Sequence, residues 1–374
     1  MPNGDQTVPI ALPQKVAILF SDVKREYFPS EEAYLTEKDA DVYADEVAKY
    51  VVKMGIDVAL FPGNEAVVNK LKNFRPDLVI NLVDSVRGDE TLNASVPGML
   101  EMLHLPYTGS GILGQSLNTN KYLTYQLLQN GGIPVPHHQL VTQPNQLIDP
   151  VLRYPLFAKL NNMHSSIAID DNNICQNERE LRLKLKELYE QYHQSMLVDE
   201  FIAGKEVTVP VLDGLNTKVY PAERIFTNGE TEKPEGYKIV TFKQKWITWQ
   251  GTTFLKHDDD NLRELARKAF GLVKMSDYSR FDVRVDGAGR NYFIDANANP
   301  FFGPPQETHS PFTMILEMYG VNFEEILRRL FVNTMRAASG LSAPKGERTN
   351  RPVEPPKILP SVIVPKKKFW KILG

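Results

Sequence analysis

The chain has 374 residues, more than one compact core usually holds, so two or three domains are expected. It carries 43 basic and 46 acidic side chains, and this formal net charge of −3 argues against nucleic acid as a partner. Cys175 is the single cysteine, which excludes a disulfide framework and fits a reducing, cytoplasmic compartment. We expect no secretory signal in residues 1–14 and no membrane-spanning segment, because long apolar runs are missing.

Short apolar runs alternate with helical patterns in the first third of the chain. This alternation is typical of a parallel α/β sheet. We therefore predict a Rossmann-like N-terminal domain over residues 15–117, preceded by a disordered segment over residues 1–14. The expected strands and helices are 15–20, 40–54, 56–61, 65–74, 77–83 and 97–104.

A second unit is predicted over residues 118–212. Asn177 can cap a helix because Glu180 follows it three residues later, which is the pattern of a capping box. A polar loop with Ser165 and Ser166 follows a predicted strand, and we expect the strand to resume at residues 167–169. The other expected elements are a helix over 121–129 and strands over 155–160, 196–202 and 206–212.

A third unit is predicted over residues 213–334, with helices over 261–274 and 323–331. After it the composition changes: residues 335–374 contain six prolines, nine basic and two acidic side chains. This composition predicts a disordered tail. The last ten residues, PKKKFWKILG, combine lysines with apolar side chains, so they are either a weak docking segment for an anionic membrane or a partner, or a solubilising end.

The segment 280–299 is the most informative part of the third unit, because two predicted strands flank a DGAG turn in it. We expect Val285 to pair with Arg290 across a four-residue loop, which places Asp282 opposite Phe293. One residue more or fewer in the loop would turn one strand over.

In this register, Asp282, Asp295 and Asn297 share one face of the hairpin, and Arg280 faces Asp295. Two carboxylates and an amide oxygen are the hard ligands that Mg²⁺ prefers, with Mn²⁺ as an alternative. Arg280 beside them would stabilise a developing anion. The other interpretation of the pattern is a solvated hairpin face.

Two lysines lie at the edges of predicted elements. Lys121 opens a helix, and Lys159 lies in a strand before Ser165 and Ser166. Lysines beside a flexible polar loop can hold phosphates. The other interpretation is that each is a surface side chain. Neither a GxxxxGK phosphate loop nor a GxGxxG dinucleotide motif occurs in the sequence.

Several motifs together resemble those of the ATP-grasp enzymes, and within them the D-alanine–D-alanine ligase branch. The resemblance covers residues 15–333 and implies a three-domain α/β fold, in which an N-terminal parallel α/β domain precedes two α+β units that sandwich ATP. The motifs, in chain order, are LPYTGSG (105–111), the helix start at Asn120 and Lys121, PLFAKL (155–160), VDEFIAGKEVTVPVL (198–212), FKQKW (242–246), the hairpin 280–300 and Thr308-His309-Ser310.

The resemblance also implies roles for individual residues. The implied ATP ligands are Lys121 and Lys159 on the phosphates, Ser165 and Ser166 in a lid, Asp199, Glu200, Phe201 and Ile202 at the adenine, and Glu206 at the ribose. The implied magnesium ligands are Asp282, Asp295 and Asn297. The implied catalytic residues are Lys245 on the transferring phosphate, Arg280 at the tetrahedral intermediate and Ser310 on the second substrate's carboxylate.

The sequence departs from this family's pattern on the acceptor side. Asp84 and Ser85 replace a His-Gly pair, residues 21–34 replace a Gly-rich loop, and Phe301 and Phe302 replace a glycine. The resemblance therefore implies an ATP-dependent ligase of a small-molecule carboxylate and an amine, acting through an acyl phosphate, with an altered acceptor pocket and as a homodimer. A nucleotide-gated binding protein with little turnover is the alternative.

Overall fold

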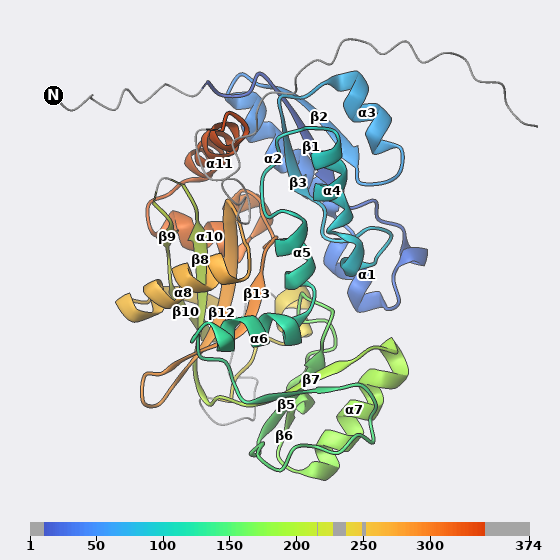
Figure 1. Cartoon of the computed structure of the whole chain (residues 1–374), viewed down its shortest axis with the longest axis vertical. Coiled ribbons are helices and arrows are strands. Elements are labelled where there is room, and N and C mark those ends of the chain that lie inside the picture. Colours follow the sequence, from blue (N-terminus) through green and yellow to red (C-terminus); the bar gives the residue numbers. More distant parts are fainter. Residues whose placement is uncertain (1–10, 215, 227–236, 249–251, 341–374) are drawn as a thin grey trace, which may run out of the picture.

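The computed structural model describes residues 11–214, 216–226, 237–248 and 252–340. Its N-terminal part contains a parallel sheet in which β1 (Lys15–Phe20) lies between β2 (Asp57–Pro62) and β3 (Leu78–Leu82) (Figure 1). Tyr107 adds a parallel bridge to this sheet, as expected for a segment that returns to its edge. The prediction of a parallel α/β sheet is confirmed.

Both faces of this sheet are covered, because alternate residues of β1 are buried on opposite sides. Val16 and Ile18 join a core that includes α2 (Ala40–Lys53) and α11 (Phe323–Ala338). Their neighbours on β1 join a second core with α3 (Val67–Phe74) and α4 (Ser95–Met102). The last long helix of the chain therefore packs on the first sheet and fixes the N-terminal unit to the C-terminal one.

A six-stranded antiparallel sheet forms the middle of the molecule, with the strand order β11-β10-β8-β12-β13 and β9 paired to β8. Helices α6 (Lys121–Asn130) and α8 (Asp260–Leu272) contribute side chains to its core. The strands are β8 (Gly204–Leu212), β9 (Lys218–Val219), β10 (Ala222–Phe226), β11 (Thr252–Lys256), β12 (Tyr278–Asp286) and β13 (Asn291–Asn297).

A four-stranded antiparallel sheet, ordered β4-β7-β5-β6, lies at the opposite end from the parallel sheet (Figure 1). Helix α7 (Glu178–Tyr192) packs on it, and the Asn177 side chain accepts a hydrogen bond from the Glu180 amide, so the predicted cap is confirmed. The strands are β4 (His138–Val141), β5 (Leu156–Leu160), β6 (Ile174–Cys175) and β7 (Met196–Glu200).

Two details of the middle region differ from the sequence prediction. Residues 167–169 form turns instead of a strand, and the strand resumes only at β6. Strand β8 pairs with β12 along its whole length, so it belongs to the six-stranded sheet, although the predicted boundary after Leu212 grouped it with the preceding unit. The valine-rich pattern of β8 indicates burial on both faces but does not reveal which sheet receives the strand.

The ends of the folded region also differ from the prediction. Leu12 packs on the core and the Gln14 amide donates to Asp77, so residues 11–14 are ordered, and residues 1–10 lie outside the described part. Helix α11 continues to Ala338, past the predicted start of the tail at residue 335, because Met335 still contacts the core. The remainder of the predicted tail lies outside the described residues.

The remaining helices are short and connect the larger elements. Among the described residues, no helix has the length and apolarity needed to cross a membrane. The short helices are η1 (Arg25–Tyr27), α1 (Glu31–Glu37), η2 (Glu90–Leu92), α5 (Ile112–Asn118), η3 (Asp171–Asn173), η4 (Lys243–Ile247), α9 (Pro305–Thr308) and α10 (Pro311–Met318).

Candidate active site

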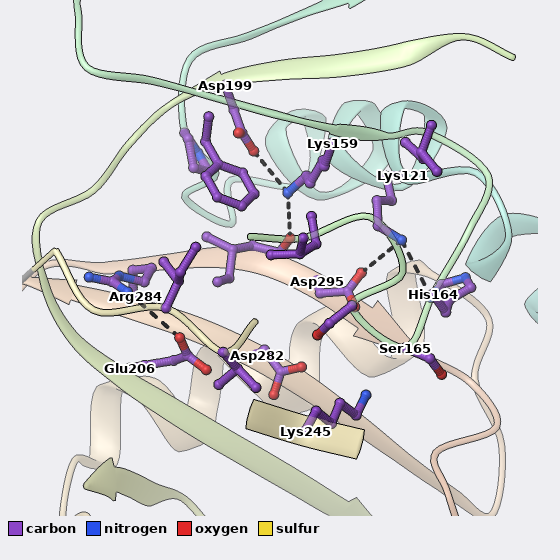
Figure 2. A pocket seen from close by; sticks show the side chains of 18 of the residues that line it. Lys121, Lys159, His164, Ser165, Asp199, Glu206, Lys245, Asp282, Arg284 and Asp295 are labelled. Atoms are coloured by element: carbon purple, nitrogen blue, oxygen red, sulfur yellow. Dashed lines mark hydrogen bonds and ion pairs between the residues drawn. The ribbon is translucent and has the colours of Figure 1, made fainter. Parts of the chain in front are cut away.

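A deep pocket lies between the four-stranded and the six-stranded sheet (Figure 2). Strands β5 and β7 form one wall, β8, β12 and β13 form the other, and the loop 161–169 covers one end. The structure brings together most of the residues selected from the sequence. Those that line the pocket are Lys121, Lys159, Ser165, Ser166, Asp199, Glu200, Phe201, Ile202, Glu206, Lys245, Arg280, Asp282 and Asp295.

The two lysines are buried and point into the pocket, so neither is a surface side chain (Figure 2). Lys159 Nζ lies 2.9 Å from Asp199 Oδ2 and donates hydrogen bonds of 3.0 Å to the Tyr125 hydroxyl and the Ile294 carbonyl. Lys121 Nζ donates to the Met163 carbonyl at 2.7 Å. These contacts hold two ammonium groups in fixed positions, which suits them to bind an anion such as a phosphate chain.

The predicted hairpin forms, but in a different register. Asp282 lies directly opposite Asp295, not opposite Phe293, because Ile294 is an extra residue that forms a β-bulge. The turn also differs: the Asp286 amide donates to the Arg290 carbonyl, so three residues form the loop instead of four. Each change shifts the register by one residue in the same direction, and the total shift of two residues beyond the bulge keeps Asp282 and Asp295 on their predicted face, so both carboxylates still line the pocket.

The carboxylates of this hairpin provide oxygen atoms for a cation. Asp282 Oδ2 accepts from Arg280 at 2.9 Å, and Asp295 Oδ2 accepts from the Asn297 amide at 3.3 Å. Asp295 Oδ1 is buried without a hydrogen bond, although Lys121 Nζ lies 3.4 Å away. Two carboxylates, a neighbouring amide and an unsatisfied oxygen fit Mg²⁺, which keeps further positions for water and phosphate.

The charge state of Asp295 supports this fit. Burial raises the pKa of its carboxyl, but the positive charge of Lys121 and the nearby His164 and Lys159 outweigh burial and hold the pKa far below its usual range. Asp295 is therefore an ionised ligand at neutral pH. Within the described ranges, no group of three His, Cys, Asp or Glu side chains could hold a metal ion, so the predicted magnesium site would depend on two carboxylates and an amide.

Lys245 and Arg280 add positive charge where the pocket meets its neighbouring cavity. Burial, together with the charge of Arg280, lowers the pKa of the Lys245 ammonium to about 7. A cation destabilised in this way is stabilised when an anion binds beside it. The two side chains therefore mark a place where a negatively charged group can be held.

The opposite end of the pocket is built around Glu206. Its carboxylate lies 3.2 Å from Arg224 and 3.6 Å from Arg284. Arg284 also donates to the Ile202 carbonyl at 2.9 Å, and its guanidinium lies 4.8 Å from the centre of the Phe201 ring. Arg284 lies two residues after Asp282 on β12 and so shares its face of the strand, whereas no signal in the sequence singled out Arg224.

The loop over the phosphate end is held in place from two sides. Trp246 Nε1 donates to the Ser165 carbonyl at 2.8 Å, and the Ala168 amide donates to Glu32 at 2.8 Å. The His164 amide donates to Glu90 at 3.1 Å, and its ring lies within 3.4 Å of Lys121 Nζ. The His164 side chain is therefore a largely buried part of the site, and burial and the charge of Lys121 lower its pKa to about 3.

Two predicted residues lie elsewhere. Ser310 is fully buried, donates to the Phe301 carbonyl at 2.6 Å and caps α10, and the pocket includes its neighbour Pro311 instead. A role of Ser310 in substrate binding therefore stays a prediction. Asn297 lines a second cavity, which adjoins the first at Lys245 and Arg280.

The second cavity is walled by the N-terminal unit. Asp84 and Phe301, two of the residues at which the sequence departs from the family pattern, line it. Phe302 lies behind it in the core and lines a smaller neighbouring cavity that also includes Tyr43. The second cavity meets the first pocket at Lys245 and Arg280, so a molecule bound in it would face the Lys245 ammonium and the Arg280 guanidinium.

Comparisons with known proteins agree with this geometry. Residues 127–332, more than half of the chain, match the family model described as the D-ala D-ala ligase C-terminus. A D-alanine–D-alanine ligase from Actinobacillus pleuropneumoniae is 28% identical over 326 residues, which span 85% of this chain and 97% of the relative. An uncharacterized protein, y4sG, from Sinorhizobium fredii is 26% identical over 298 residues, which span 76% of this chain and 84% of that protein.

Solved structures give the same fold. The D-alanine–D-alanine ligase from Bacillus anthracis complexed with ATP superposes with a TM-score of 0.67 at 17% identity, covering 89% of this chain and all of that one. The chain therefore belongs to the D-alanine–D-alanine ligase-like branch of the ATP-grasp family, as the sequence motifs indicated. Members of this class are ATP-dependent ligases, and ATP and Mg²⁺ are their usual cofactors.

Proposed function

We propose that this protein is an ATP-dependent ligase that joins a small carboxylate to an amine through an acyl phosphate. The observation that supports this proposal is the junction of the two cavities at Lys245 and Arg280. One cavity offers buried ammonium groups and carboxylates for Mg-ATP, and the other offers room for acceptors. A site that only bound nucleotide would not need a second cavity at the phosphate end.

The residues that line the first pocket have different roles in binding Mg-ATP. Lys121 and Lys159 orient the phosphate chain, and Glu206 with the segment Asp199–Ile202 binds the nucleoside. Asp282, Asp295 and Asn297 would hold Mg²⁺, which supplies neutralisation of phosphate charge. The site residues then place a substrate carboxylate next to the terminal phosphate.

The chemical steps follow from this placement. The carboxylate attacks the γ-phosphorus, and ADP leaves as the acyl phosphate forms. The amine then attacks the acyl carbon, Arg280 stabilises the oxyanion of the tetrahedral intermediate, and phosphate leaves as the amide forms. Arg280 is held for this role by its 2.9 Å hydrogen bond to Asp282, and it is buried.

The acceptor cavity favours a substrate other than D-alanine alone. Asp84 places a carboxylate in the cavity, and the ring of Phe301 narrows it. We expect D-alanine to be ligated to itself poorly, and a larger amino acid, dipeptide or amino-bearing carboxylate to react faster.

The test is phosphate release from Mg-ATP with D-alanine, pooled amino acids of both configurations and small peptides, with products identified by mass. Ligation in any pool supports the ligase. D-alanyl-D-alanine formed faster than every other product would contradict the altered pocket. Tight ATP binding without product in any pool would instead favour the nucleotide-gated binding protein.

A further inference from the structure

The second cavity contains more carboxyl groups than one amino group requires. The carboxyl groups of Glu37, Asp84 and Glu90 all line it. Glu37 is 7% exposed and the Glu90 side chain 14%, so water stabilises their charged forms only weakly. Burial raises the pKa of all three groups, so a positive charge that joins them would stabilise their ionised forms.

Hydrogen bonds satisfy these carboxylates only in part. Glu37 accepts from the Ser85 hydroxyl at 2.9 Å, Asp84 accepts from the Asn299 amide at 2.9 Å, and Glu90 accepts from the His164 amide. In the part of the chain that the structure describes, none of the three forms an ion pair with lysine or arginine. The protein cations that line this cavity, Lys245 and Arg280, therefore do not pair directly with the three carboxyl groups.

An independent feature of the same cavity also points to a ligand. Asn93 is 5% exposed and lines the cavity, and its Oδ1 atom has no hydrogen-bond partner. An unsatisfied buried carbonyl oxygen costs free energy, and an N–H donor that entered the cavity would remove that cost. Asn93 and the carboxyl groups would therefore bind the same kind of group, a cationic nitrogen with several N–H bonds.

The cationic side of the cavity sets the orientation of a bound molecule. Lys245 and Arg280 lie where the cavity meets the nucleotide pocket, and the three carboxylates come from the N-terminal unit. A molecule with an anionic carboxylate at one end and positive charge at the other fits this polarity.

We propose that this cavity binds a substrate with a cationic group beyond the amine that becomes the amide, such as a diamino acid or a polyamine, held by Glu37, Asp84 and Glu90. This inference rests on the proposed ligase function and assigns its substrate class. The amide-forming steps are unchanged, and the extra ammonium group stays intact throughout.

Direct binding tests the inference without turnover. Calorimetric titration of the full chain with L-lysine, D-lysine, L-ornithine and spermidine is compared with titration by the uncharged-side-chain analogue norleucine, with Mg-ADP present. We expect at least one of the cationic probes to bind at least tenfold more tightly than norleucine. Equal affinity for norleucine and every cationic probe would overturn the proposal.

Variants connect the preference to the named carboxylates. Glu37→Gln and Asp84→Asn keep the shapes and the hydrogen bonds to Ser85 and Asn299, and each should reduce the preference at least fivefold. Asp41→Asn removes an exposed carboxylate nearby and should leave it unchanged. A preference that survives in both cavity variants would overturn the assignment. If Glu37→Gln lowers the melting temperature, Asp84→Asn alone provides the test.

Turnover separates this inference from the proposed function. Ligation of neutral amino acids only would leave the ligase standing and reject the cationic substrate. Tight, carboxylate-dependent binding of a diamine without any ATP-dependent product would support the cation site and reject the ligase.

Discussion

Asp295 is the residue on which the proposed metal site depends most. Its Oδ1 atom is buried without a hydrogen bond, so a cation has an oxygen ready to bind. Asp295→Asn keeps the shape and removes the charge, and we expect Mg-dependent ATP consumption to fall about 100-fold or more while the melting temperature changes little.

The matched control is Asp258→Asn, whose side chain is 93% exposed and which should retain full activity. Loss of activity in both variants, or activity within a few-fold of wild type in Asp295→Asn, would contradict the metal site.

Lys245 gives the site a pH dependence. Its pKa is lowered to about 7, so the ammonium loses its proton as the pH rises through that value. If its charge holds phosphate, ATP affinity is highest below pH 7 and falls above it, with a midpoint raised by the bound phosphates. Titration of ATP between pH 6 and 9 measures this.

Lys245→Arg is the comparison variant, because arginine remains charged throughout this range. Its ATP affinity should be nearly independent of pH, although the geometry of the contact changes. The same pH dependence in the variant as in the wild type would assign the titration to another group.

At the residue scale, the sequence predicted which residues line the pocket better than it predicted the contacts between them. Motifs in order located both lysines and both hairpin carboxylates, because those residue types are needed for phosphate and metal. Arg224 was missed, since its partner Glu206 lies on another strand and only the β8–β10 pairing brings the two together.

At the scale of elements, one aromatic side chain helps to hold the loop 161–169 in place. The Trp246 indole donates to the Ser165 carbonyl from the short helix η4. Trp246→Phe keeps a ring beside Lys245 but removes the donor, which weakens closure by about 1 kcal/mol. We expect KM for ATP to rise about fivefold with an unchanged melting temperature.

Steady-state kinetics at saturating acceptor measures this change. Ile247→Val alters a half-exposed side chain of the same helix and serves as the control. An unchanged KM in Trp246→Phe would show that the hydrogen bond does not hold the loop during turnover.

The hairpin shows why element boundaries were easier to predict than register. The alternation of residues in 280–297 correctly predicted two strands that bury a polar face in the pocket. The bulge at Ile294 and the three-residue turn depend on local hydrogen bonds, and in the turn the Asp286 carboxylate accepts from the amides of Ala288 and Arg290. A pattern with period two cannot detect an extra residue of this kind.

At the scale of the whole molecule, the residues that form the cavities all precede α11, which ends at Ala338. Removing residues 341–374 should therefore leave kcat, KM and the melting temperature unchanged. Co-sedimentation of the full chain with phosphatidylserine vesicles, compared with the shortened chain, separates a docking segment from a solubilising end. Lost turnover with normal melting would contradict this expectation.

The parallel sheet and its helices were predictable because β1 and β3 are apolar and buried on both faces, and the alternation of strands and helices repeats. The packing of α11 on that sheet was not, because its partners lie about 300 residues earlier in the chain and nothing local encodes the contact. The sheet to which β8 belongs could not be predicted for the same reason, because its partner β12 lies far away in the sequence.

Glu90 contacts both halves of the site. Its carboxylate lines the second cavity and accepts a hydrogen bond from the amide of His164, whose loop covers one end of the first pocket. We therefore expect occupation of one cavity to change the closure of the loop over the other. Thermodynamic reciprocity then requires that the acceptor strengthens ATP binding by the same factor as ATP strengthens acceptor binding. An enzyme linked in this way keeps its loop open to either substrate alone, and ATP is protected from wasteful hydrolysis until its co-substrate has arrived.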